Sequence, residues 1–160
     1  MENLLSKASV KRVKEFLTSR NSDLKIIVLN TTAKTALNAA EALKCDVGAI
    51  VKSLLVKAGN NFLICLVAGD KRCSFKKIKK ILKIDEILMA NADEVKMYTG
   101  FTIGGVSPVA HVKKLNVFID KSLSRFINLY AAAGHPNCVF KITYDQLVEI
   151  TNGSEFELTE

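Results

Sequence analysis

The chain has 160 residues, of which 49% are hydrophobic and 24% charged, the composition of an ordinary globular domain large enough to bury a core. Its longest apolar run, 62–68, is far shorter than the roughly 20 residues of a membrane-spanning helix, and the first residues lack a signal-peptide core. We therefore expect a cytoplasmic protein without a membrane contact. Four cysteines without a CxxC spacing, together with two histidines, argue against a metal site, and no cofactor is expected.

The formal net charge of +7 is unevenly distributed along the chain. Residues 1–83 contain 17 Lys and Arg against 6 Asp and Glu, whereas residues 84–160 contain 6 against 10. A basic half favours an anionic partner such as RNA. A solvated basic surface with no partner has the same composition, so charge alone leaves both interpretations open.

Helices and strands mix along the first half of the chain. Apolar residues at helical spacing predict a helix over 6–20, and the aliphatic, β-branched segment 23–30 predicts a strand. Alanine and leucine residues share one face of a predicted helix over 32–45. A hairpin follows over 49–70, with its turn at Gly59, Asn60 and Asn61.

The segment 74–83 predicts a helix with an apolar stripe on one side and lysines on the other. The lysine face consists of Lys76, Lys79, Lys80 and Lys83. A short strand is expected over 86–90, and then a helix over 91–100 that begins with a capping box from Asn91 to Glu94.

The last third predicts strands over 115–120, 125–134 and 137–143, and a helix over 144–151. Because no regular βαβ period appears, the pattern favours an α+β fold in which hairpins wrap a mixed sheet or barrel.

An apolar, glycine-rich loop, GFTIGGVSPVAH, occupies residues 100–111. The pair Gly104-Gly105 permits backbone angles that are closed to other residues and lets another molecule approach the main chain. Successive free N–H groups in such a loop can bind an anion or an oxyanion. A glycine-rich turn that only connects two elements is the alternative. No phosphate-loop or GxGxxG pattern accompanies it, so standard nucleotide binding is disfavoured.

Lys52 lies inside the apolar strand segment IVKSLLV. A lysine there must reach water, pair with another group or border a pocket. A position on the solvent side of a half-buried strand is the alternative. Neither His111 nor His135 has a nucleophile or acid near it in sequence, and no GxSxG elbow is present.

Several segments together, in their order along the chain, resemble a known family. They are TAKTALNAAEALKCDVGAIVKSLLV, FLICLVAGDKR, ADEVKMYTGFTIGGVSPVAH, NVFID and AAAGHPNCVFKIT. The chain resembles the YbaK/EbsC-type aminoacyl-tRNA deacylases, relatives of the editing domain inserted in bacterial prolyl-tRNA synthetases. The resemblance covers about 24–152, and its most specific parts are the IVKSL strand and the GxxxP loop from Gly104 to Pro108.

The resemblance implies a single compact α+β domain over 1–160, with a mixed, mostly antiparallel, barrel-like sheet and surrounding helices. It implies trans-editing: hydrolysis of the ester that joins a wrong amino acid to a tRNA 3′ end. The substrate class would be a small amino acid on tRNA-Pro or a related tRNA. The expected partners are the aminoacylated tRNA 3′ end and an aminoacyl-tRNA synthetase.

The resemblance also assigns roles to residues. The expected catalytic group is Lys52, Gly104, Gly105 and Val106, with Lys52 binding the terminal phosphate or ribose and backbone N–H groups of 104–106 stabilising an oxyanion. A ribose hydroxyl of the substrate would orient the water. The expected substrate-binding residues are Ile103, Pro108, Gly134, His135 and Asp120. The lysine face is the expected tRNA contact, although a solvated helix face is the usual alternative.

Two other functions fit the same residues. One is a tRNA- or RNA-binding module without catalytic activity, for which the basic half would serve equally well. The other is a protein-interaction regulator on the same fold, which would bind a protein partner and no tRNA. Hydrolysis of mischarged tRNA by the purified protein distinguishes the deacylase from the RNA-binding module, and absence of tRNA binding with a stable protein partner in pull-downs would indicate the regulator.

Overall fold

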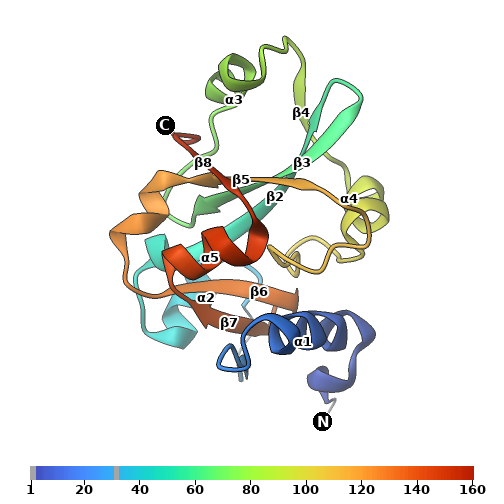
Figure 1. The fold of residues 1–160 in the computed structure, drawn as a ribbon. Helices are drawn as coiled ribbons and strands as arrows, with labels where there is room; N and C mark the ends of the chain where they lie inside the picture. Colours follow the sequence, from blue (N-terminus) through green and yellow to red (C-terminus); the bar gives the residue numbers. More distant parts are fainter. Residues whose placement is uncertain (1–2, 31–32) are drawn as a thin grey trace.

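A computed structural model describes residues 3–30 and 33–160, and in them an eight-stranded mixed sheet is surrounded by α-helices (Figure 1). The strands are β1 (Ile26–Val28), β2 (Ile50–Ala58), β3 (Asn61–Ala68), β4 (Ile87–Met89), β5 (Asn116–Asp120), β6 (Leu129–His135), β7 (Cys138–Ile142) and β8 (Ser154–Phe156). The α-helices are α1 (Ala8–Arg20), α2 (Ala36–Leu43), α3 (Phe75–Leu82), α4 (Ala92–Thr99) and α5 (Tyr144–Thr151). Three short 3-10 segments are η1 (Leu4–Ser6), η2 (Val47–Ala49) and η3 (Lys121–Arg125).

The strand order is β1-β7-β6-β2-β3-β5-β8, with β4 paired to β2 beside this path. The long β2–β3 hairpin at its centre is antiparallel, whereas β2 pairs with β6, β3 with β5, and β5 with β8 in parallel. The sheet curls into a half-barrel whose end strands β1 and β8 do not meet in this path. The expected single compact α+β domain with a mixed, barrel-like sheet is confirmed.

Two apolar cores cover the two faces of the central hairpin. On one face, Val10, Val13 and Leu17 of α1 pack with Leu55 and with Phe101, all of them buried. On the other face, buried side chains of β2 and β3 pack against Ile78 of α3. Each core uses one of the two alternating side-chain faces of the strands, because successive strand residues point in opposite directions.

Most expected elements are present, with differences at three places. The helix expected from residue 32 begins at Ala36, and Thr32 lies outside the described residues. The strand expected over 125–134 begins only at Leu129, because Arg125 is the last residue of η3 and the N–H of Phe126 closes that helix by bonding to Leu123. Strand β8 was not expected, since its three residues carry no alternating pattern and form a strand by pairing with β5.

The four lysines of the lysine face are exposed, and Ile78 on the opposite side of α3 is fully buried. The amphipathic helix expected there is therefore confirmed. Within residues 3–30 and 33–160, no helix has the length and apolar character needed to cross a membrane.

Candidate functional site

A cavity of about 360 Å³ lies along one edge of β2. On this edge β6 pairs with β2 only at Ile50 and Val51, and β4 pairs with it only from Val56 onward. Residues 52–55 therefore have no strand partner on this edge among the described residues. The cavity occupies the gap, and its wall includes Ala132 of β6 and Met89 of β4.

The wall of this cavity is mostly small and apolar. The residues with alanine or valine side chains that line it are Ala33, Ala36, Ala39, Ala90, Ala132, Val51, Val95, Val106 and Val139. Lys34 and Lys52 are its charged residues, and neither Asp nor Glu is among the residues of its wall. A site of this kind suits a small, partly apolar group that is attached to an anion.

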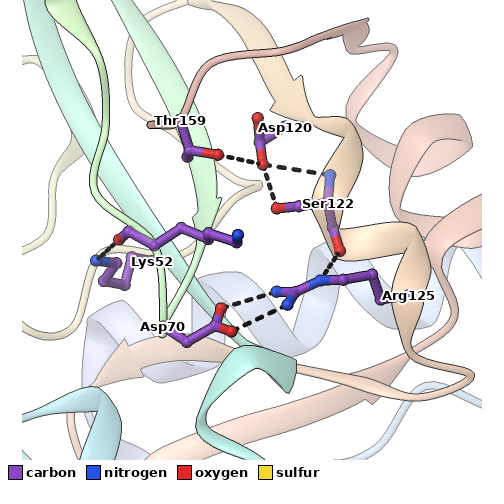
Figure 2. Close-up of polar contacts among 7 residues, drawn as sticks. Lys52, Asp70, Asp120, Ser122, Arg125 and Thr159 are labelled. Atoms are coloured by element: carbon purple, nitrogen blue, oxygen red, sulfur yellow. Dashed lines mark hydrogen bonds and ion pairs between the residues drawn. The ribbon is translucent and has the colours of Figure 1, made fainter.

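Lys52 borders this cavity and also a second hollow on the other side of β2. Its Nζ donates a 2.7 Å hydrogen bond to the carbonyl oxygen of Lys71, the contact drawn beside Lys52 in Figure 2. Burial lowers the pKa of Lys52, while the nearby Cys73 and Asp70 act in the opposite direction. Lys52 thus lines the cavity, while its partly desolvated ammonium group is held by the β3–α3 turn, a setting in which a lysine can bind an anion.

The glycine-rich loop forms the wall opposite α2 through Ile103, Gly104 and Val106. The Gly105 N–H donates to the carbonyl oxygen of Thr102 at 3.0 Å, so it is already used within the loop. The N–H groups of Gly104 and Val106 make no hydrogen bond to any other described residue. Of the three N–H groups expected to stabilise an oxyanion, only those of Gly104 and Val106 remain available as donors.

Gly104 and Gly105 of this loop are required for different reasons. Gly104 has a φ of +94°, a conformation that side chains disfavour. Gly105 instead packs against backbone: a Cβ there would lie 3.0 Å from the nitrogen of His135. Gly134 has the same kind of constraint, because a Cβ there would lie 2.7 Å from the carbonyl oxygen of Ser9. Gly105 and Gly134 thus let the loop, the end of β6 and α1 approach one another closely.

The apolar character of the loop has a simple cause. Phe101, Val106 and Val109 are buried in the main core, and the guanidinium of Arg12 lies 4.5 Å above the Phe101 ring. Arg12 also donates to the carbonyl oxygens of Thr99 at 3.1 Å and Ala110 at 2.8 Å. Most of the loop is therefore core, and only its central part faces the cavity.

Other residues expected to bind substrate lie outside the cavity wall. Pro108 is buried and borders a separate surface hollow next to α1. The Nδ1 of His135 accepts a 3.0 Å hydrogen bond from the N–H of Asn137 within the β6–β7 turn. Its neighbour Pro136, which was not expected, is the residue of this turn that lines the cavity.

Asp120 is 2% exposed and lies at the end of β5, where its carboxylate binds groups of the protein itself. It accepts hydrogen bonds from the N–H of Leu158 at 2.6 Å and the hydroxyl of Thr159 at 3.1 Å. It also accepts from the N–H and the hydroxyl of Ser122 (Figure 2). The structure thus gives Asp120 the contacts of a residue that fixes η3 and the C-terminal segment.

Asp120 is nevertheless connected to Lys52 through a series of polar contacts (Figure 2). Arg125 donates through Nε to the carbonyl oxygen of Ser122 at 2.6 Å and through both terminal nitrogens to Asp70, at 2.7 and 3.0 Å. Asp70 precedes Lys71, whose carbonyl oxygen binds Lys52. Bidentate Arg–carboxylate pairs have a fixed geometry, so this pair positions the β3–α3 turn that holds Lys52.

His111 ends the glycine-rich loop and borders the hollow next to α1, not the cavity. His111 Nε2 lies 2.7 Å from the carbonyl oxygen of Ser107, and burial lowers the pKa of this histidine. Within the described parts of the chain, no group of three or more His, Cys, Asp or Glu side chains is placed to hold a metal ion.

A sequence profile of the aminoacyl-tRNA editing domain matches residues 30–150. The chain belongs to the aminoacyl-tRNA editing domain family. Among solved structures, it is similar to a candidate trans-editing enzyme for prolyl tRNA synthetase, with 33% identity and a TM-score of 0.91 over 96% of this chain and 98% of the other. It is also similar to the hypothetical protein APE2540, with 26% identity and a TM-score of 0.86 over 93% and 99% of the two chains.

Curated relatives of this editing-domain chain are of two kinds. The uncharacterized protein YwhH of Bacillus subtilis (strain 168) is 29% identical over 144 residues, which cover 89% of this chain and 91% of YwhH. A proline–tRNA ligase of Bacillus licheniformis is 32% identical over 124 residues, which cover 76% of this chain but 21% of the ligase. The chain therefore spans about a fifth of the length of such ligases.

Sequence reasoning missed several residues of the editing-domain cavity. Ala33, Ala36 and Ala39 come from the segment around α2, and Tyr130 comes from β6. Alanines on a helix face are usual core residues, so they carry no signal of a cavity. Ser53 was considered only as a nucleophile and set aside for want of a GxSxG elbow, whereas in the structure it lines the cavity and its hydroxyl has no partner among the described residues.

Proposed function

We propose that this chain is a trans-editing deacylase that hydrolyses the ester between a small amino acid and the 3′ end of a mischarged tRNA, with tRNA-Pro or a related tRNA as the carrier. It would act in the cytoplasm, where aminoacyl-tRNA is made. One observation carries the proposal: Lys52, Gly104 and Val106 line the same small, apolar cavity, and the N–H groups of Gly104 and Val106 make no hydrogen bond to another described residue. Membership of the editing-domain family supports it.

The proposed reaction needs no covalent intermediate, because an aminoacyl ester is already activated. The oxygen of a water molecule attacks the ester carbonyl carbon, and the carbonyl oxygen becomes negatively charged. The N–H groups of Gly104 and Val106 donate to this oxyanion. The bond from carbon to the ribose oxygen then breaks, the ribose oxygen takes a proton, and free amino acid and tRNA leave. Loss of one oxyanion donor typically slows such a reaction by about 10²–10³-fold.

Lys52 is assigned to the tRNA side of the bond. Lys52 lines the cavity, and its ammonium group, which rests on the Lys71 carbonyl oxygen in the free protein, would bind the terminal phosphate or the ribose. The partly desolvated position strengthens this interaction, because charges attract more strongly where water is excluded. A ribose hydroxyl of the substrate orients the attacking water in this proposal, since no described Asp or Glu lines the cavity to act as a base.

The size of the cavity supports a small amino acid. A volume of about 360 Å³ must hold both the aminoacyl group and part of the terminal nucleoside. The short side chains of α2 and the valines of the wall then leave room for a small side chain. The exposed Ile103, 64% exposed at the rim, is available to pack on the terminal base or ribose.

The test is a panel of tRNAs, each charged with one amino acid and incubated with purified protein, while the remaining ester is measured over time. The proposal expects rapid hydrolysis for one or a few small amino acids and stable esters for large ones. Binding of tRNA without hydrolysis of any ester would instead favour the RNA-binding module. Absence of tRNA binding together with a stable protein partner in pull-downs would favour the interaction regulator.

A further inference from the structure

Ser53 Oγ is the only buried side-chain oxygen or nitrogen without a hydrogen-bond partner in the described parts of the chain. The residue lines the cavity next to Lys52. Burying a hydroxyl without a partner destabilises a fold, so such groups are rare and need an explanation. A ligand that supplies the missing partner is one explanation, and the position of Ser53 in a cavity wall supports it.

The backbone of Ser53 faces the same cavity. Val51 pairs with β6 on this edge, and the carbonyl oxygen of Leu55 accepts a 3.1 Å hydrogen bond from the N–H of Ala90. Strand residues present their N–H and C=O groups to alternate edges, so Ser53, midway between these two, presents both to this edge as well. Since no described strand pairs with residues 52–55 here, Ser53 offers an N–H, a carbonyl oxygen and a hydroxyl to the gap.

The wall of the cavity offers few acceptors for the α-amino group of a substrate. An aminoacyl ester brings an α-amino group, which is a hydrogen-bond donor in both of its protonation states. No carboxylate lines the cavity to receive it. The hydroxyl oxygen of Thr35 already accepts from the N–H of Asn38 at 3.1 Å as the cap of α2. Among the described residues of the wall, the remaining side-chain hydroxyls are those of Ser53 and Tyr130.

We propose that Ser53 is a positioning residue that binds the α-amino group of the aminoacyl ester through its carbonyl oxygen and its hydroxyl. The inference rests on the proposed editing function and defines its substrate class: esters with a free α-amino group. Peptidyl-tRNA and formylated initiator tRNA have an acylated α-amino group with fewer hydrogens to donate and more bulk, so this contact excludes them. A serine side chain has three staggered rotamers, so the hydroxyl can turn to the bound group.

Lys52 and Ser53 would then share the substrate between them. Successive strand residues point to opposite faces, and Lys52 accordingly reaches the β3–α3 turn while Ser53 shares its face with Val51 and Leu55. In this proposal Lys52 binds the tRNA end and Ser53 binds the amino acid. Two consecutive residues of β2 thus fix the two sides of the ester bond.

The test compares two esters on the same tRNA. One is the aminoacyl ester that the wild-type protein hydrolyses fastest, and the other carries the same acyl group without its α-amino group, such as propionyl in place of alanyl. Comparing each ester between wild-type and variant protein cancels the different chemical reactivities of the two. The variants are Ser53→Ala, the conservative Ser53→Thr, and Tyr130→Phe as a control that removes a hydroxyl from another part of the wall.

The proposal expects Ser53→Ala to lower kcat/KM for the aminoacyl ester about tenfold, the effect of one lost hydrogen bond to a charged group, and to change the deamino ester less than about twofold. Ser53→Thr should restore most of the difference between the two esters, and Tyr130→Phe should leave it unchanged. The assignment would be overturned if Ser53→Ala lowered kcat/KM equally for both esters or for neither. It would also be overturned if Tyr130→Phe, and not Ser53→Ala, abolished the difference in kcat/KM between the two esters.

Failure of the proposed function gives a different result. If the wild-type protein hydrolyses no aminoacyl ester, the editing function and the role of Ser53 both fall. If it hydrolyses aminoacyl esters and Ser53→Ala keeps the wild-type ratio between the two esters, only the role of Ser53 falls. A melting temperature of Ser53→Ala at or above that of the wild type is also expected, because the variant removes a buried hydroxyl that has no partner in the free protein.

Discussion

Asp120→Ala tests whether the buried carboxylate at the end of β5 stabilises the fold or binds substrate. The substitution leaves the N–H of Leu158 without an acceptor, and Leu158 is 0% exposed, so water cannot replace the lost bond. An unsatisfied buried donor costs about 1–3 kcal/mol. The half-buried N–H of Ser122 adds a smaller loss, and the hydroxyls of Ser122 and Thr159 can rotate to other acceptors.

Together these losses predict a decrease of about 3 kcal/mol in the free energy of unfolding, or roughly 6–12 °C in melting temperature for a domain of this size. Thermal unfolding followed by circular dichroism measures it, with the exposed Asp23→Ala as a matched control that should stay within about 0.5 kcal/mol of the wild type. Deacylation measured well below the melting temperature should keep its KM. An unchanged melting temperature with a raised KM for aminoacyl-tRNA would refute this reasoning and place Asp120 in the binding site.

Three further changes test the catalytic and tRNA-binding assignments. Lys52→Ala should lower kcat/KM for deacylation by about 100-fold with little change in melting temperature, whereas Lys57→Ala on the same strand should not; near-wild-type turnover would remove Lys52 from the site. Gly105→Ala places a Cβ 3.0 Å from backbone atoms and should lower both activity and melting temperature. Gly104→Ala has 3.5 Å to its nearest neighbour and should mainly lower activity, because the alanine must adopt a positive φ. A larger loss of melting temperature in Gly104→Ala than in Gly105→Ala would contradict the packing argument. Changing the four lysines of the α3 lysine face to Gln should flatten the salt dependence of tRNA affinity by up to about 3 log units per log unit of salt if all four contact phosphates, and an unchanged slope would exclude this helix from the tRNA interface.

The lysine face has a structural control on the opposite end of the molecule. Figure 1 shows α3 near the top of the molecule and α1 near the bottom. Four exposed lysines on or near the α1 end can be changed to Gln with the same loss of charge: Lys11, Lys14, Lys25 and Lys141. If the two quadruple variants flatten the salt slope equally, only total charge matters. A larger effect at α3 locates the phosphate contacts.

The local parts of the fold could be predicted from the sequence because their causes are local. The capping box of α4 forms between Asn91 and Glu94 as expected, and the apolar stripe of α3 is buried around Ile78. Lys52 became a candidate because a charged residue interrupts an apolar strand, and the structure places it in the cavity wall. In each case the residues that determine the structure lie within a few positions of one another.

The parts that could not be predicted depend on contacts between distant segments. Gly105 was expected to be glycine so that its backbone could reach a substrate, but the residue instead packs on the backbone of His135. Nothing in the loop sequence shows that the end of β6 lies against it. Asp120 reads as one acid at a strand end, and its partners at Leu158 and Thr159 come from a segment with no pattern of its own.

The position of the cavity follows from the pairing of β2. An unpaired strand edge is ordinarily a liability, because its free N–H and C=O groups invite association with other chains. Here the edge over 52–55 is open between β6 and β4 but enclosed by α2 on one side and the glycine loop on the other. Foreign strands are thereby kept away, while a small group can still enter. The same opening that exposes Ser53 to a ligand also has Lys52 in its wall. The incomplete pairing of β2 therefore brings the candidate binding residues to one place.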